Sequence, residues 1–267
     1  MDEMTVKELE HQKDLQRLRG FRPIDDDFMR GMFKKNIELV QFVLRIILDK
    51  QDLVITSCET QADMKRVTGA RSICLDAYGT DSEGTKYDIE IQRADAGADP
   101  KRARYHSSVM DVENLDAGQK FSLLPETYTI FITEKDFFGD GDAVYEFEMK
   151  SKKNKPLNDG AHIVYVNGEY RGEDALGLLM HDFNCISAAD MHYELMSVRT
   201  QYLKENPEGV SIMCKAMEDM RNEAVLANNY EIAKALWNDG VHDLERIARL
   251  VKLTLEQVKE AIGIQTA

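Results

Sequence analysis

The segment LDAYGTDSEGTKYDIEIQR, residues 75–93, constrains the fold of this chain more than any other. Its second half alternates strictly between apolar and polar residues from Lys86 to Gln92, which is the period of a β-strand. The first half, from Ser72 to Gly79, alternates less regularly and leads into the turn-forming residues DSEG. Two such runs on either side of a short polar turn predict a tight β-hairpin.

Acidic and amide side chains are expected together on one face of this hairpin. The second strand places Tyr87, Ile89 and Ile91 on one face and Asp88, Glu90 and Gln92 on the other. With Asp76 on the first strand, carboxylate oxygens from two strands can converge on one point, as in sites that hold a hard divalent cation for phosphate chemistry. Solvated hairpin faces are also often acidic, so these residues alone favour an ordinary acidic surface.

The order of these residues resembles a known nuclease motif. An Asp on one strand followed by Glu-Ile-Gln on the next is similar to the core of PD-(D/E)XK nucleases, with Gln92 at the position of the motif lysine. The similarity is greatest to the PD-(D/E)XK nuclease family transposases, the recombination-promoting (Rpn) nucleases. It extends to the segment DDDFMRGMF near the start, to the helix that carries Arg102, Arg104 and Tyr105, and to LLPETYTIFITEKDFFGDGDAVYEFE. It covers most of the chain from about residue 22 onward.

The resemblance implies an α/β fold with a restriction-endonuclease-like core, in which helices flank a mixed β-sheet. A helical C-terminal region follows this core. We expect a polar N-terminal arm over residues 1–21, the nuclease core over 22–172, and the helical region over 173–267. The residue pattern alone is consistent with an α/β sheet covered by helices but does not select this fold over other α/β folds.

The pattern also predicts individual elements along the chain. We expect a helix over residues 27–50, a short extended segment at 54–56, and a helix from residue 100 to about 112. Strands are expected at 127–133, 143–149 and 162–166, separated by a Phe-Gly turn and by the lysine-rich connector 150–160. Helices should occupy the chain from about residue 174, with a break at 206–209.

The resemblance implies a catalytic centre and its metal. Asp76 and Glu90 would bind Mg²⁺ or Mn²⁺, with the Ile91 carbonyl as a third oxygen ligand. Gln92 carries no charge and cannot act as a general base, but its amide can position a water molecule.

Other residues are weaker candidates for this site. Asp88 lies two residues before Glu90 on the same face, and the sequence leaves open whether it binds metal, supports the site or is solvated. Tyr105 and Gln119 could contact a phosphate, although packing is the better interpretation for Tyr105. Glu38, on the first core helix, is more typical of a solvated surface than of a ligand. His106 is expected to be structural or exposed.

The charge of the chain bears on DNA as a partner. The 48 acidic and 34 basic residues give a formal net charge of −14, whereas DNA-binding proteins usually present a basic surface. DNA contacts would therefore need a local basic patch, for which Arg93, Arg102 and Arg104 are the candidates, with Lys101 beside them. Lys65, Arg66 and Arg71 precede the hairpin. The same residues could equally balance charge on solvated helices.

Composition indicates a soluble globular protein without a membrane partner. The hydrophobic fraction is 43%, and no apolar run approaches the length of a membrane span. The charged first residues do not resemble a signal peptide, so we expect a cytoplasmic protein. The four cysteines are far apart, with no Cys-x-x-Cys pair, and we expect no nearby histidine at zinc-ligand spacing, reduced thiols and no zinc site.

The last helices have helix-turn-helix-like spacing but little positive charge. From Tyr230 to Ile262 five basic residues oppose six acidic ones, which favours packing or self-association over base reading.

These observations predict a metal-dependent DNA endonuclease of the transposase or recombination-promoting type. The alternative is a catalytically inactive nuclease-fold protein that acts in binding or assembly. Because single-site nucleases commonly cut both strands as pairs, a homodimer is a candidate assembly.

Overall fold

The computed structural model of the chain describes residues 6–64, 73–93 and 97–264. It separates the chain into two compact units, Met1–Met213 and Cys214–Ala267. Among the described residues, no helix is both long and apolar enough to cross a membrane.

The first unit begins with three helices: α1 (Val6–Gly20), α2 (Asp26–Phe33) and α3 (Ile37–Ile47). The expectation of one continuous helix over residues 27–50 is wrong. Lys35 adopts a left-handed backbone conformation with φ of 53°, which ends the first helix. The side chain of Asn36 then accepts a hydrogen bond of 3.2 Å from the Leu39 N–H and starts the second.

The centre of this unit is a six-stranded mixed sheet with the strand order β1-β2-β3-β4-β6-β5. The pairs β3–β4 and β4–β6 are parallel, whereas β1–β2, β2–β3 and β5–β6 are antiparallel. Strand bounds are β1 (Ile55–Met64), β2 (Ile73–Asp81), β3 (Lys86–Gln92), β4 (Thr127–Thr133), β5 (Val144–Phe147) and β6 (Ala161–Asn167).

These strands confirm the predicted hairpin and the three later strands. β2 and β3 form the hairpin, and β4 occupies the residues predicted for it, all of them buried. The first strand is longer than expected, because residues beyond Thr56 continue as β1 along the edge of β2. The polar sequence of β1, ITSCETQADM, does not indicate a strand. β1 lies at the edge of the sheet, and an edge strand pairs on one side only and need not be apolar.

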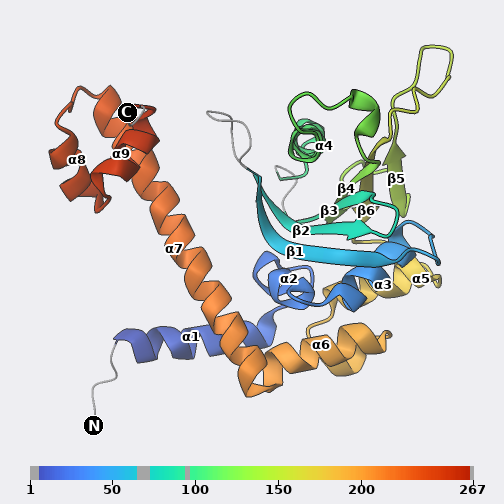
Figure 1. The fold of residues 1–267 in the computed structure, drawn as a ribbon. Helices are drawn as coiled ribbons and strands as arrows, with labels where there is room; N and C mark the ends of the chain where they lie inside the picture. The colour runs from blue at the N-terminus through green and yellow to red at the C-terminus, as the bar shows by residue number, and fades with distance from the viewer. Residues whose placement is uncertain (1–5, 65–72, 94–96, 265–267) are drawn as a thin grey trace, which may run out of the picture. The chain divides into compact units, whose positions relative to one another are not determined.

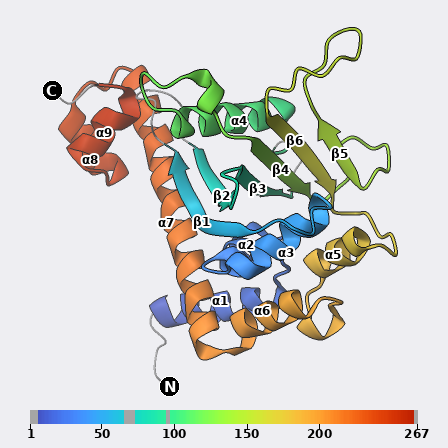
Figure 2. The same cartoon turned by 45° about the vertical axis from the view of Figure 1, so that its right-hand side comes forward.

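Helices cover both faces of the sheet (Figures 1 and 2). Helix α4 (Pro100–Asn114) lies on one face, and α2, α3 and α5 (Ala175–Asn184) lie on the other. Asp99 caps α4 by accepting a hydrogen bond of 2.7 Å from the Lys101 N–H, and Pro100 occupies the first helical turn. This start of α4 fixes which residues of the helix face β3. The α/β expectation is therefore confirmed.

The chain leaves the sheet through α5 and α6 (Glu194–Glu205), and α7 (Pro207–Asn238) runs from the first unit into the second. The second unit also contains α8 (Leu244–Val251) and α9 (Leu255–Ile262). Its own small core joins Ala233 of α7 to residues of α8, α9 and their connection, namely Ile247, Ala248, Val251, Leu253, Val258 and Ala261. Helix α9 begins with a reciprocal capping box between Thr254 and Gln257.

Candidate active site

Asp76 and Glu90 bridge the hairpin where its strands part. The backbone pairing of β2 with β3 runs from Thr80–Lys86 to Ala77–Ile89. At the next position the Asp76 N–H donates a hydrogen bond of 3.0 Å to Glu90 Oε1. The Ile91 N–H donates one of 3.3 Å to Asp76 Oδ2. Carboxylates thus take the place of backbone acceptors, and both acidic side chains are held in the gap between the strands.

Asp88 extends this acidic group beneath α4. The Asp88, Glu90 and His106 residues are at most 1% exposed, so the face of β3 predicted to be polar is covered by the helix. Asp88 Oδ2 lies 3.0 Å from His106 Nδ1, and Glu90 Oε1 lies 3.8 Å from the same nitrogen. One ligand atom from each of these three residues falls within 4.8 Å of the others.

Arg102 of α4 closes the site from the other side. Its guanidinium donates to Glu90 Oε2 at 3.1 Å, to Gln92 Oε1 at 3.3 Å and to the Gly97 carbonyl at 3.3 Å. Its Nε–H donates to His106 Nε2 at 3.3 Å, so His106 Nδ1 carries the proton that is donated to Asp88.

Gln92 lies within this arrangement at the position of the motif lysine. Its Nε2 lies 3.5 Å from Glu90 Oε2, a long contact, while its Oε1 accepts from Arg102. Gly97 packs closely against the amide, because a Cβ at that position would lie 1.8 Å from Gln92 Oε1. The backbone at Gly97 therefore restricts where the Gln92 side chain can lie.

Burial raises the pKa values of the three carboxyl groups, and repulsion within the group raises those of Asp88 and Glu90 further. Burial is the main cause for Asp76 and raises its pKa to about 6, against the opposing charge of Arg30 and the Ile91 N–H. Burial, followed by the charge of Asp76, raises the pKa of Asp88 well above its ordinary value. Burial and then the charges of Asp88 and Asp76 do the same for the pKa of Glu90. Carboxyl groups with pKa values raised in this way favour binding of a proton or a metal cation.

The donor set fits a divalent cation. Within the part of the chain that the structure describes, Asp88 Oδ1 is buried and has no hydrogen-bond partner. An unpartnered carboxylate oxygen in a dry site is unfavourable, and a cation would satisfy it. Asp76, Glu90 and Asp88 supply the oxygen ligands that Mg²⁺ and Mn²⁺ prefer.

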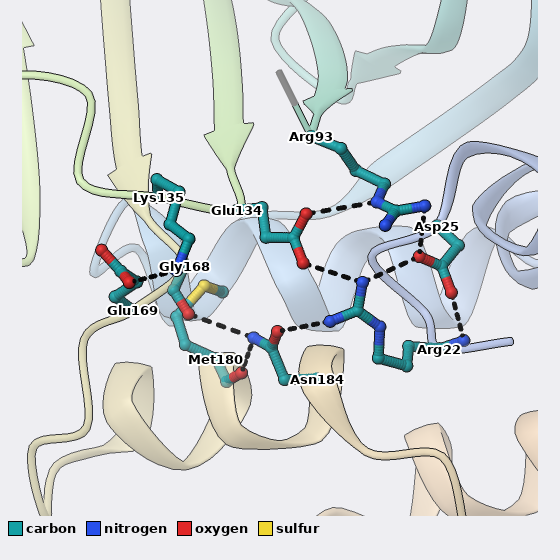
Figure 3. A network of polar contacts seen from close by, with 9 residues as sticks. All are labelled: Arg22, Asp25, Arg93, Glu134, Lys135, Gly168, Glu169, Met180 and Asn184. Atoms are coloured by element: carbon teal, nitrogen blue, oxygen red, sulfur yellow. Dashed lines mark hydrogen bonds and ion pairs between the residues drawn. The ribbon is translucent and has the colours of Figure 1, made fainter. Parts of the chain in front are cut away.

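Arg93, a candidate DNA contact, lies in a separate ion-pair network (Figure 3). Its guanidinium contacts Asp25 at 3.1 Å and Glu134 at 3.2 Å, and Arg22 binds the same two carboxylates at 3.0 and 2.8 Å. This network joins the end of β3 and the residue after β4 to the start of α2. The charge of Arg93 is therefore largely offset by these two carboxylates, although its side chain is 51% exposed.

The remaining candidates fall into different places. Arg104 is exposed on α4, and Tyr105 is partly buried beside it. Glu38 is exposed and lines a hollow with residues of α6. Gln119 is exposed, and its side chain accepts from the Asp116 N–H in a local turn. The structure therefore brings Asp76, Asp88, Glu90, Gln92 and Arg102 together. Lys65, Arg66 and Arg71 lie outside the described residues.

Two features of the site escaped the sequence analysis. His106 was expected to be structural or exposed, yet it joins Asp88 to Arg102 in the buried site. Helix α2 also contributes, because the charges of Arg30 and Asp26 act on Asp76 with opposite sign. The spacing of Arg102 and His106, one helical turn apart on the helix after the hairpin, was the available signal for the first.

The fold and the site together define a PD-(D/E)XK-type nuclease core: a mixed sheet flanked by helices, with Asp on one hairpin strand and Glu-x-Gln on the next. The family model for the PD-(D/E)XK nuclease family transposases matches residues 30–169. The chain belongs to this family, which confirms the resemblance and the restriction-endonuclease-like fold. Membership supports a nuclease or transposase type of function, and nucleases of this kind generally use divalent metal ions and act on DNA. No curated protein and no solved structure matches the chain significantly.

Proposed function

We propose that this protein is a metal-dependent DNA endonuclease that hydrolyses phosphodiester bonds, of the transposase or recombination-promoting (Rpn) type. The observation that carries the proposal is the pair Asp76 and Glu90, held across the parting strands of the hairpin with the unpartnered Asp88 Oδ1 beside them.

In this proposal Asp76, Glu90 and the Ile91 carbonyl hold Mg²⁺ or Mn²⁺, and Asp88 supports the ion. The bound ion would lower the pKa of a water molecule and offset charge on the scissile phosphate. Gln92 orients that water through its amide, because it has no charge with which to abstract a proton. His106 keeps Asp88 in place through the hydrogen bond from Nδ1.

Arg102 has the chemistry to contact the phosphate. Its side chain is 41% exposed although its partner Glu90 is buried, so it lies at the mouth of the site. A guanidinium there can stabilise the charge of a phosphate in the transition state. Arg104 and Lys101 are exposed on the same helix and provide positive charge in a chain of net charge −14.

A second candidate function is binding or assembly without catalysis. It is favoured by Gln92 at the lysine position and by the ion pair between Arg102 and Glu90, which already neutralises one of the proposed metal ligands. Both functions predict the same fold but differ in metal-dependent cleavage.

The test is cleavage of supercoiled plasmid with Mg²⁺ or Mn²⁺. The wild-type protein should nick or linearise the DNA, and both Glu90→Gln and a chelator should abolish the reaction. Glu83→Gln, in the exposed turn of the same hairpin, is the matched control and should remain active. Absence of cleavage by the folded wild-type protein under either metal would favour the binding function.

The form of the product bears on assembly. One site cuts one strand at a time, so we propose that linear product arises from two copies of the chain acting together. We further propose that the protein acts in the cytoplasm, where DNA and Mg²⁺ are both accessible.

A further inference from the structure

A second group of metal-ligand side chains lies at the C-terminal end of α5, apart from the candidate active site. It consists of His181, Asp182 and Cys185, whose ligand atoms lie within 4.8 Å of one another. His181 precedes Cys185 by four residues and therefore lies on the same side of the helix. Cys185 is the first residue after α5, where the chain turns back toward α6.

The distances within this group fit one tetrahedral ion. Cys185 Sγ lies 3.5 Å from His181 Nδ1, and Asp182 Oδ1 lies 3.3 Å from the same nitrogen. Zinc bonds of about 2.0–2.3 Å at a tetrahedral angle separate pairs of ligand atoms by about 3.3–3.6 Å. Two of the three ligand pairs thus already have the separation found around a tetrahedral zinc ion, and the three ligand atoms all lie within 4.8 Å of one another.

We propose that His181, Asp182 and Cys185 bind a Zn²⁺ ion through one ligand atom each. The ring of His192 packs beside this group, 4.5 Å from that of His181 between centroids, but does not belong to it. Nitrogen and thiolate ligands with a single carboxylate select Zn²⁺ over Mg²⁺. The proposal does not depend on the nuclease function.

The surroundings hold the ligands in place. The buried Asp182 carboxylate accepts hydrogen bonds of 2.8 Å from the N–H groups of His192 and Tyr193, which fixes its orientation. Asn184 anchors the same end of α5, because its side chain donates to the carbonyls of Gly168 and Met180 (Figure 3). Supporting hydrogen bonds of this kind are typical of metal sites.

The electrostatics also favour a cation. Burial raises the pKa of the Cys185 thiol, and the charges of Asp182 and Asp190 raise it further against the smaller effect of Arg171. A divalent ion offsets this negative charge and stabilises the thiolate. His181 is 39% exposed in its side chain and provides the path by which the ion enters.

Bound zinc would stabilise the end of α5, where Asp182 also accepts the hydrogen bonds from His192 and Tyr193 just before α6. No zinc site was expected from the sequence, because it has no Cys-x-x-Cys pair and no histidine was recognised at zinc-ligand spacing. The pattern that bears on this site is a histidine and a cysteine four residues apart, His181 and Cys185.

The test is titration of the full-length protein with Co²⁺, which reports thiolate ligands by charge-transfer absorption in the near ultraviolet. The wild-type protein should show this band together with the visible bands of tetrahedral Co²⁺, and Zn²⁺ should displace both. Cys185→Ser should remove the charge-transfer band and lower affinity by more than about 100-fold. His181→Gln, at a half-exposed position, should weaken binding without unfolding the protein.

Matched controls separate this site from others. Cys214→Ser and Cys58→Ser should leave the band unchanged, as should Glu90→Gln, because the candidate active site contains no cysteine. The proposal is overturned if the folded wild-type protein gives no charge-transfer band, or if the band survives Cys185→Ser.

Discussion

Arg102 and Glu90 form an ion pair of 3.1 Å in which the carboxylate is buried and the guanidinium reaches solvent. A positive charge is thus in place beside one of the proposed metal ligands before any substrate arrives. Because Arg102 also contacts Gln92 and His106, one arginine connects three of the polar side chains of the site. This makes its replacement the sharpest test of how the site works.

Arg102→Ala should reduce plasmid cleavage by on the order of 100-fold, since a charged donor to the phosphate is lost. Binding of Mn²⁺ should persist, because Asp76, Asp88 and Glu90 remain. Rates with saturating metal and metal-induced shifts of the melting temperature distinguish these effects. Arg104→Ala, two residues away on the same helix, is the control and should weaken DNA binding without a comparable loss of maximal rate. Unchanged cleavage in Arg102→Ala would exclude the phosphate role.

Asp88→Asn should leave the metal-free protein at least as stable as the wild type. The substitution keeps the shape of a buried side chain but removes a negative charge close to Asp76 and Glu90. Saturating Mn²⁺ should stabilise the wild-type protein, by about 2.7 kcal/mol at 100 times Kd, and the variant less. Thermal unfolding with and without metal measures both effects. A metal-free variant that melts well below the wild type would show that Asp88 is needed for structure instead.

Asp81, in the hairpin turn, should stabilise the folded protein through its negative charge, unlike Asp88. Burial tends to raise its pKa, but hydrogen bonds from the Tyr87 hydroxyl and from the N–H groups of Glu83 and Thr85 outweigh this, so the pKa is lowered. A lowered pKa in the folded state stabilises the protein above the unfolded value of about 3.9, and this stabilisation is lost as the pH falls. Asp81→Asn should therefore cost about 1–3 kcal/mol at pH 7.

The pH dependence of this stability difference tests whether the charge of Asp81 causes it. The difference in urea midpoint between wild type and Asp81→Asn should shrink as the pH is lowered below about 4, where the wild-type carboxylate also becomes protonated. Asp52→Asn, at an exposed position, is the control and should show no such change. A difference that stays constant with pH would mean that shape, not charge, stabilises the turn.

Local patterns predicted the elements that local chemistry controls. The alternation of β3 and the turn DSEG specify the hairpin, and a run of apolar and β-branched residues specifies β4. Asp76 and Glu90 were predicted as ligands because carboxylates on the two strands of a hairpin can converge and because their order resembles the nuclease motif. The break between α2 and α3 was missed, because apolar spacing continues across Lys35 and only its backbone conformation ends the helix.

Contacts between segments that are far apart in the chain could not be predicted from the sequence. The burial of Asp88 and Glu90 depends on α4 lying over β3, and the offset of Arg93 depends on Asp25 and Glu134, which are far from it in the chain. Neither the packing of α4 over β3 nor the ion pairs of Arg93 produce a periodic pattern in the sequence. His106 was visible as a residue but not as a partner of Asp88, since its role depends on the start of α4 at Asp99.

The connector between β5 and β6, the long loop between these strands in Figure 1, carries several lysines in an otherwise acidic protein. Lys152, Lys153 and Lys155 are all exposed on this loop, which is closed by the pairing of Lys150 with Pro156. Replacing these three lysines by glutamate should weaken DNA binding and lower the salt slope of log K by up to about 0.9 per lost phosphate contact. Fluorescence anisotropy over a series of salt concentrations measures both. The matched control replaces Lys234, Lys252 and Lys259 in the second unit by glutamate. The net charge from Tyr230 to Ile262 is −1, so this control should change DNA affinity little. A larger loss in that control would instead make the C-terminal helices the DNA-binding part of the protein.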